Sequence, residues 1–118
     1  SLIDKKIDLF FTSGDNTVSL AVETIAHRLK AKKIPYFTNG FSDVEKGAFL
    51  SNGADYVEVG NEIARQAKLV FKGGNTKNIP IKNYVPEKFY LNLALANEFG
   101  IKIPDSFIKK ANMVRRAK

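Results

Sequence analysis

The residues best suited to ligand binding in this sequence form one short cluster: Ser13, Gly14, Asp15, Asn16 and Thr17. Residues 7–12 (IDLFFT) precede it and are typical of a buried parallel strand, while a helical pattern follows it. In open α/β sheets, ligands bind at this edge, where a strand ends and a helix begins. The first N–H groups of a helix lack partners within the helix and attract carboxylate or phosphate groups. Gly14 would let a ligand approach the backbone, and Asp15 offers a carboxylate to an ammonium group.

A purely structural role for the same cluster stays open. Asp15 or Asn16 would then be only the N-cap of the helix, and Gly14 only a turn residue. Asn39 and Gly40 follow the next strand, expected over residues 34–39, and they belong beside the first turn if the two strands are neighbours. Their own alternative is an ordinary Asn-Gly turn. Two strand ends with polar residues still favour a binding edge over either end alone.

Other polar clusters do not indicate catalysis. Residues 72–77 (KGGNTK) lack the spacing of a phosphate-binding loop and follow a helix rather than a strand. Two carboxylate pairs have no histidine or nucleophile close in sequence, which favours solvated surface charge: Asp43 with Glu45, and Asp55 with Glu58. His27 is the only histidine, and there is no cysteine, so His- and Cys-based metal sites are disfavoured. We expect a non-enzymatic protein with no cofactor and no metal.

The spacing of apolar residues predicts an α/β fold. Val18, Val22, Ile25 and Leu29 form one helical stripe between the two expected strands, which makes a βαβ unit. A second amphipathic helix is expected from Tyr56 to about Val70, after an Asn-Gly turn at residues 52–53.

The rest of the chain alternates short elements. Residues 79–85 are expected to be extended, and residues 89–92 to form the last strand. A short helix over 93–99 then ends at Gly100, and a final helix runs from Asp105 to about Met113.

Composition places the chain among globular proteins. Its 118 residues suit a single α/β unit, and 44% of them are hydrophobic. The net charge is +7. Five of the 19 basic residues lie after Asp105, and the other 14 are nearly balanced by the 12 acidic residues of the chain. We therefore expect a basic last helix and tail rather than a nucleic-acid surface. No apolar run approaches the roughly 20 residues of a membrane span, and any signal segment would lie outside this chain.

The sequence resembles the substrate-binding proteins of ABC transporters, in particular their C-terminal portion. The resemblance rests first on residues 7–18 (IDLFFTSGDNTV), residues 34–40 and residues 46–48 (KGA). Residues 53–56 (GADY), Ile79-Pro80 and residues 93–104 (LALANEFGIKIP) extend it over nearly the whole chain. Named members of this group bind aromatic amino acids such as tryptophan or tyrosine.

This resemblance implies a type I periplasmic-binding architecture, with two three-layer, flavodoxin-like lobes that close on a solute. Residues 1–45 would belong to the second lobe, residues 46–80 would cross to the first, and residues 81–118 would return. The protein would be extracytoplasmic, in the periplasm or as a cell-surface lipoprotein, and would deliver a small solute, such as an amino acid, to an ABC permease. Residues 13–17, Asn39 and Gly40 would face that solute.

Three alternatives come from other classes of protein. The same fold serves as the effector-sensing domain of transcription regulators, and a flavodoxin-like enzyme would carry bound flavin. The third alternative is an inactive fragment that self-associates as a homodimer through faces that an absent lobe would cover.

Overall fold

The computed structural model describes residues 4–81, 83 and 85–116, which form two compact units. The first unit comprises Ser1–Gly53 and Lys88–Lys118, and the second comprises Ala54–Glu87. We describe each unit separately. In the part of the chain that the structure describes, no helix has the length and apolar content needed to cross a membrane.

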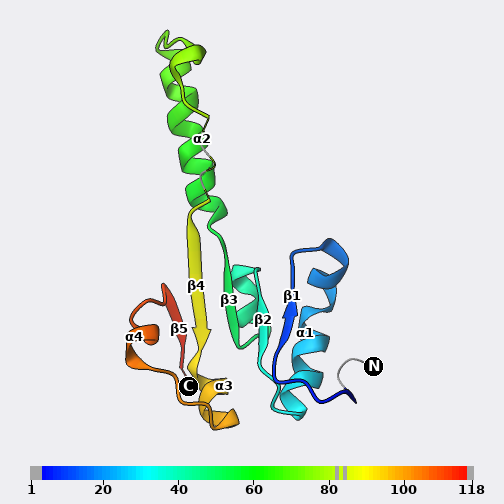
Figure 1. Ribbon diagram of the computed structural model, residues 1–118. Coiled ribbons are helices and arrows are strands. Elements are labelled where there is room, and N and C mark those ends of the chain that lie inside the picture. Colours follow the sequence, from blue (N-terminus) through cyan, green and yellow to red (C-terminus); the bar gives the residue numbers. More distant parts are fainter. Residues whose placement is uncertain (1–3, 82, 84, 117–118) are drawn as a thin grey trace. The chain divides into compact units, whose positions relative to one another are not determined.

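A mixed five-stranded sheet, in the order β1-β2-β3-β4-β5, is the framework of the fold (Figure 1). The strands are β1 (Phe10–Thr12), β2 (Tyr36–Thr38), β3 (Leu50–Ala54), β4 (Glu87–Asn92) and β5 (Met113–Arg115). β1, β2 and β3 are parallel to one another, and β4 is parallel to β5. β4 runs opposite to β3, since the N–H of Asn92 at its end donates to the carbonyl of Phe49 just before β3 begins.

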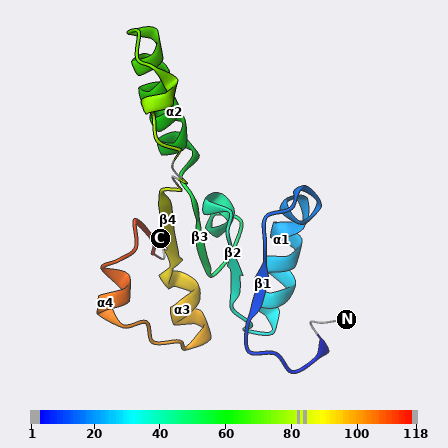
Figure 2. The same ribbon diagram turned by 45° about the horizontal axis from the view of Figure 1, so that its top comes forward.

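The predicted βαβ unit is confirmed by β1, α1 (Asn16–Ala31) and β2. Helix α1 lies beside β1 (Figure 2) and buries Val22, Ala26 and Leu29. These side chains share an apolar cluster with Tyr36 of β2 and with Tyr90 of β4. The stripe read from the sequence is therefore the face by which α1 covers the sheet.

A second apolar cluster joins β3 and β4 to helix α3 (Leu93–Phe99). Its buried members are Phe49, Leu50, Leu91, Leu95 and Ala96. Gly100 follows α3 with a φ of 73° and caps it, as predicted from the sequence. The two clusters fix the strands between α1 and α3, and the strand ends are held in place by that packing.

The third strand differs from the sequence prediction. Asn52-Gly53 was expected to be a turn, yet both residues lie inside β3, whose sequence is LSNGA. β3 has only one large apolar residue, Leu50, and its Ser51 is fully buried with its hydroxyl donating to the carbonyl of Phe41. A strand can therefore be buried without an apolar run when its polar side chain has a hydrogen-bond partner, and such a strand is not recognised from the sequence pattern.

The C-terminal region also differs from the prediction. The final helix, α4 (Asp105–Ile108), is only four residues long, and β5 follows it, so residues 89–92 are not the last strand. Asn112 ends the helical region because its N–H donates to the carbonyl of Phe89 and its side chain accepts from the N–H of Phe89.

The basic end of the chain is therefore a helix end only in part: Lys109 is the C-cap of α4, whereas the later basic residues that the structure describes do not belong to a helix. Arg115 lies in β5, where its Nη1 donates to the carbonyls of Val44 and Glu45 at 3.1 and 3.0 Å. This arginine holds the connection between β2 and β3 rather than offering its charge to a distant partner.

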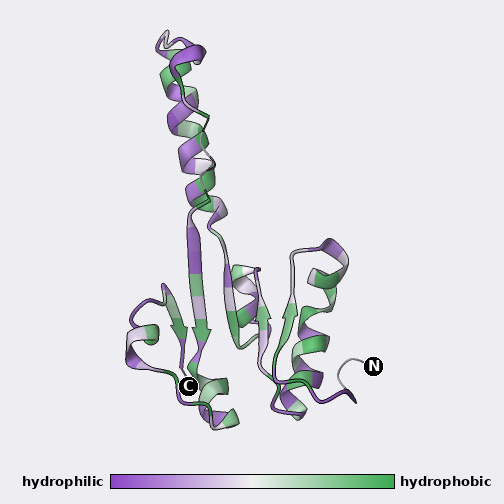
Figure 3. Ribbon diagram, viewed as in Figure 1, coloured by the Kyte–Doolittle hydropathy of each residue, from purple (hydrophilic) through white to green (hydrophobic). Residues whose placement is uncertain are grey.

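The second unit is built on α2 (Tyr56–Phe71), the second predicted helix. Asp55 caps it by accepting from the N–H groups of Val57 and Glu58 at 3.1 and 3.3 Å. The N–H of Asp55 donates to the carbonyl of Pro86, which joins the two ends of the unit. Figure 3 shows apolar and polar residues alternating along α2. The expected extended segment, residues 79–85, falls partly on residues 82 and 84, which are outside the described part of the chain.

Tyr90 makes the stability of the first unit sensitive to alkaline pH. The hydrogen bond that its hydroxyl donates to Glu45, together with burial, raises the pKa of Tyr90 above its ordinary value of about 10. The folded state then holds this proton more tightly than the unfolded state, so the free energy of unfolding falls as pH rises above about 10. Tyr90→Phe removes this contribution. Urea unfolding at pH 8 and pH 11 should show a smaller alkaline loss in the variant, and equal losses would contradict the assignment.

Candidate functional site

The predicted binding edge lies where β1 and β2 end. Thr12 and Thr38, the last residues of these strands, are partners in the parallel register. Residues 13–17 and Asn39 therefore leave the sheet at the same edge. Residues 13–17 and Asn39 are exposed and Gly40 is half-buried, so a solute could reach these residues directly.

Gly14 and Asn39 are brought into contact at this edge. A Cβ atom on Gly14 would lie 3.2 Å from both Oδ1 and Nδ2 of Asn39. The backbone of one strand end is thus packed against the amide of the other. An amide beside an uncovered backbone can donate to one ligand group and accept from another.

Asp15 is the N-cap of α1. Its Oδ1 accepts from the N–H groups of Thr17 and Val18 at 2.8 and 3.1 Å, and its carbonyl accepts from the N–H and hydroxyl of Ser19. Two of the first-turn N–H groups considered for a ligand carboxylate are therefore already bonded to Asp15. The other carboxylate oxygen, Oδ2, accepts neither capping bond. The cap fixes the orientation of the carboxylate, and Oδ2 can bind a cation.

The sequence reasoning missed Gly53 of β3, a third contributor to this edge. A Cβ atom on Gly53 would lie 1.8 Å from the carbonyl oxygen of Asn39, closer than any side chain could approach. The end of β2 therefore packs directly on the backbone of β3. From the sequence, Asn52-Gly53 was expected to be a turn. Glycine instead stands at this position of β3 because it has no side chain to block the carbonyl of Asn39.

Asp43 was also missed as a member of this region. It lies in the 3-10 turn η2 (Phe41–Val44) and is only 8% exposed, with the ammonium group of Lys46 at 3.6 Å. A Cβ atom on Gly40 would lie 2.3 Å from its Oδ2. Gly40 has an ordinary φ of −86°, so it is the Asp43 carboxylate, and not backbone conformation, that requires glycine here.

A further hydrogen bond holds the strand ends. The hydroxyls of Thr12 and Tyr36 lie 2.8 Å apart and tie β1 to β2. Burial raises the pKa of Tyr36, against the effect of its bond to Thr12, and the nearby charge of Asp43 raises it further. Tyr36 therefore stays neutral at physiological pH and serves as a fixed hydrogen-bonding group beneath the edge.

Gly40→Ala is expected to lower the free energy of unfolding by about 1–3 kcal/mol, because its methyl group must displace a buried carboxylate. Urea unfolding measures this loss. The matched variant is Gly40→Ala combined with Asp43→Ala, in which the obstructing carboxylate is absent. Its loss should be smaller than the sum of the two single losses. Additive losses would show that Asp43 does not constrain Gly40.

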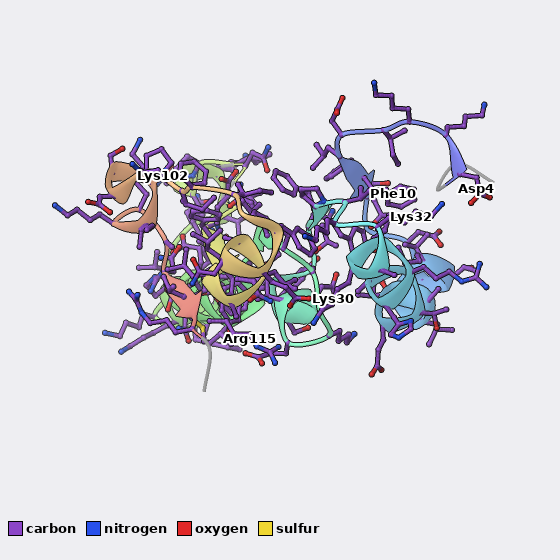
Figure 4. The ribbon with its side chains drawn as sticks, turned by 90° about the horizontal axis from the view of Figure 1, so that it is seen from below. Asp4, Phe10, Lys30, Lys32, Lys102 and Arg115 are labelled. Atoms are coloured by element: carbon purple, nitrogen blue, oxygen red, sulfur yellow. The ribbon has the colours of Figure 1, made fainter. Side chains whose placement is uncertain are left out.

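A separate cavity of about 330 Å³ lies elsewhere in the first unit. Its walls include His27 of α1, Gly47 and Asn92, together with the ion pairs Lys30–Glu98 at 2.9 Å and Arg115–Glu45 at 3.5 Å. Figure 4 shows Lys30 and Arg115 coming from different elements of this unit. The described residues that line the cavity include none of the seven predicted site residues. Four of its charged side chains are used in these two ion pairs, so we do not assign the binding site to it.

The chain matches a known protein family. The family model described as ABC transporter substrate binding protein matches residues 1–115. No curated protein matches the chain.

The solved structures that are similar to this chain include the following three. A conserved domain protein from Vibrio cholerae is 27% identical with a TM-score of 0.71, over 92% of this chain and 36% of that protein. The ABC domain from Streptococcus pneumoniae in complex with L-Trp is 28% identical with a TM-score of 0.70, over 92% and 38%. A ligand-free, open substrate binding protein with adhesive properties from Clostridium difficile is 21% identical with a TM-score of 0.76, over 98% and 39%.

This chain thus spans less than two fifths of the length of the solved structures that it matches. The likenesses confirm the predicted α/β class and its relation to type I periplasmic-binding proteins. Because the family match extends over almost all of the sequence, the chain belongs to the family of ABC transporter substrate-binding proteins.

Proposed function

We propose that this chain forms part of the solute-binding cleft of an ABC importer's extracytoplasmic binding protein. Its solute would be an amino acid, with an aromatic side chain as the leading candidate, bound without covalent chemistry. The observation that carries the proposal is the contact between Gly14 and Asn39, which unites two parallel strand ends beside the N-terminus of α1. The family match and the tryptophan complex of a 28% identical relative support it.

The two charged groups of an amino acid have complementary partners at this edge. Oδ2 of Asp15 would accept from the ammonium group, since Oδ1 is used by the cap. The carboxylate would meet the amide of Asn39 and the positive end of the α1 dipole near Asn16. Ser13, Gly14, Thr17 and Gly40 would complete the contact surface. Each of these contacts is a proposal about a half-cleft, whose other wall would come from a second lobe.

The family relationship supports the wider role. In the proposed layout, residues 1–45 and 81–118 belong to the second lobe, and residues 46–80 cross to the first. Closure of the two lobes on the solute would then present a liganded surface to a membrane permease. The location of the protein would be periplasmic or on the cell surface.

Saturation-transfer NMR tests the ligand chemistry, because it detects the weak binding expected of half a cleft. The three ligands are L-tryptophan, tryptamine, which lacks the carboxylate, and indole-3-propionate, which lacks the amine. We expect a signal at millimolar L-tryptophan that weakens at least about threefold when either charged group is missing, since each loses a charge-assisted hydrogen bond. Equal signals from all three ligands, or no signal from L-tryptophan, would overturn the proposal.

A further inference from the structure

Basic side chains from three separate segments gather at one end of the sheet in the first unit. β1 and β2 begin at this end and β4 finishes there, so it lies opposite the edge formed by residues 13–17 and 39–40. The segments are residues 4–8 before β1, residues 28–33 at the end of α1, and residues 98–102 at the end of α3. They contain seven exposed basic residues, which we call the basic surface: Lys5, Lys6, Arg28, Lys30, Lys32, Lys33 and Lys102. Figure 4, viewed from below, shows Lys30, Lys32 and Lys102 at this end.

Two ion pairs hold these segments together. Oδ1 of Asp4 lies 2.9 Å from Nζ of Lys32, which places the residues before β1 beside the end of α1. Oε2 of Glu98 lies 2.9 Å from Nζ of Lys30, which places the end of α3 beside α1 as well. The basic residues are distant in sequence, but they share one surface of the folded unit.

The acidic residues of the same segments do not balance the basic surface. Seven positive charges against three negative ones leave an excess of four, since the acidic residues are Asp4, Asp8 and Glu98. The dipole of α1 accounts for cations at its own C-terminus, but Lys5, Lys6 and Lys102 belong to other segments. The side chains of both ion pairs are between 46% and 68% exposed, so water screens these pairs and they can part to meet another ion.

We propose that the basic surface binds membranes that contain anionic phospholipid. The family of this chain serves ABC transporters, which lie in membranes, so lipid phosphate is the anion expected nearby. Lysine ammonium groups on flexible stems suit mobile headgroups, whereas single-stranded nucleic acid is bound with aromatic side chains as well. The aromatic residue of these segments, Phe99, stacks on Phe49 within the unit instead. Membrane binding of this kind does not depend on the proposed solute, because the basic surface and residues 13–17 lie at opposite ends of β1.

Sedimentation with lipid vesicles tests the proposal in the absence of any solute. An excess of four charges beside an anionic bilayer corresponds to half-binding at about 1 mM accessible lipid. At low salt, we expect the chain to sediment with mixed vesicles of phosphatidylglycerol and phosphatidylcholine, but not with phosphatidylcholine alone. Binding should be lost at about 1 M salt, where the Debye length falls to about 3 Å. Equal binding to both kinds of vesicle, or no binding to the anionic ones, would overturn the proposal.

Charge reversal locates the surface that binds. Lys5→Glu combined with Lys6→Glu removes the excess of four charges, so the affinity for anionic vesicles should fall at least about tenfold. Both side chains are exposed and neither belongs to the two ion pairs, so the fold should be kept, which circular dichroism checks. The matched control is Lys72→Glu combined with Lys77→Glu, which makes the same change in net charge on exposed residues of the second unit. This control should bind anionic vesicles nearly as well as the unmodified chain.

Two results would count against a lipid surface at this end. Equal losses in the two double variants would mean that net charge alone, and not the basic surface, governs the binding. Duplex DNA that displaces the chain from anionic vesicles at a lower phosphate concentration than the lipid itself would identify a nucleic-acid surface instead. Either result would contradict the proposal.

Discussion

Gly53→Ala is expected to lower the free energy of unfolding of the first unit by about 3 kcal/mol or more, the largest stability loss expected for any single methyl group in this chain. The added Cβ would lie 1.8 Å from the carbonyl oxygen of Asn39 and 2.8 Å from its carbonyl carbon. Both atoms are backbone, so no side-chain rotation relieves the clash, and β2 must move away from β3. Urea unfolding followed by circular dichroism measures the loss.

Gly14→Ala is the matched control for this prediction. Its Cβ would also meet Asn39, but at 3.2 Å from the side-chain amide, which can rotate. We expect a loss below about 1 kcal/mol for this variant. Similar losses for the two variants would contradict the packing of Asn39 on β3.

Asp15→Ala is expected to weaken binding of L-tryptophan at least about tenfold. The substitution removes the carboxylate that would pair with the ammonium group, a charge-assisted hydrogen bond of about 1.5–3 kcal/mol. It also removes the N-cap bonds to Thr17 and Val18, which should cost about 1 kcal/mol of stability. An NMR titration measures the affinity, and urea unfolding measures the stability.

Asp15→Asn separates the two roles of this residue. Asparagine is as good an N-cap as aspartate, so the variant should keep nearly the full stability. It lacks the negative charge, so its affinity for L-tryptophan should fall almost as far as that of Asp15→Ala. If Asp15→Asn binds as well as the unmodified chain, Asp15 is an N-cap only.

The elements that the sequence predicted correctly are those with a local signal. Helix α2 begins after Asp55, a capping residue, and α3 ends at Gly100, whose φ of 73° favours glycine. The apolar stripe of α1 was visible because Val22, Ile25 and Leu29 recur at helical spacing, and Val22 and Leu29 are buried, whereas the buried Ala26 was not among the predicted residues. In these segments the local sequence and the tertiary packing favour the same structure.

The elements that were missed depend on contacts with distant residues. β3 has a glycine because the backbone of Asn39 needs that space, and β5 exists because Asn112 pairs with Phe89 of β4. Neither partner is close in sequence, so the local sequence pattern could not reveal these strands.

The same limit applies to the site. The convergence of residues 13–17 with Asn39 was predictable from βαβ topology, whereas the contributions of Gly53 and Asp43 were not.

The central claim is that the ends of β1 and β2 bind an amino acid, and residue-resolved NMR of the ¹⁵N-labelled chain tests it most directly. The measurement is the change in amide chemical shifts during a titration with L-tryptophan to millimolar concentration. The account predicts that the largest changes fall on the backbone of residues 14–17 and 39–40 and on the side-chain amide of Asn39. Changes centred on the cavity beside His27, or no saturable change at all, would contradict it.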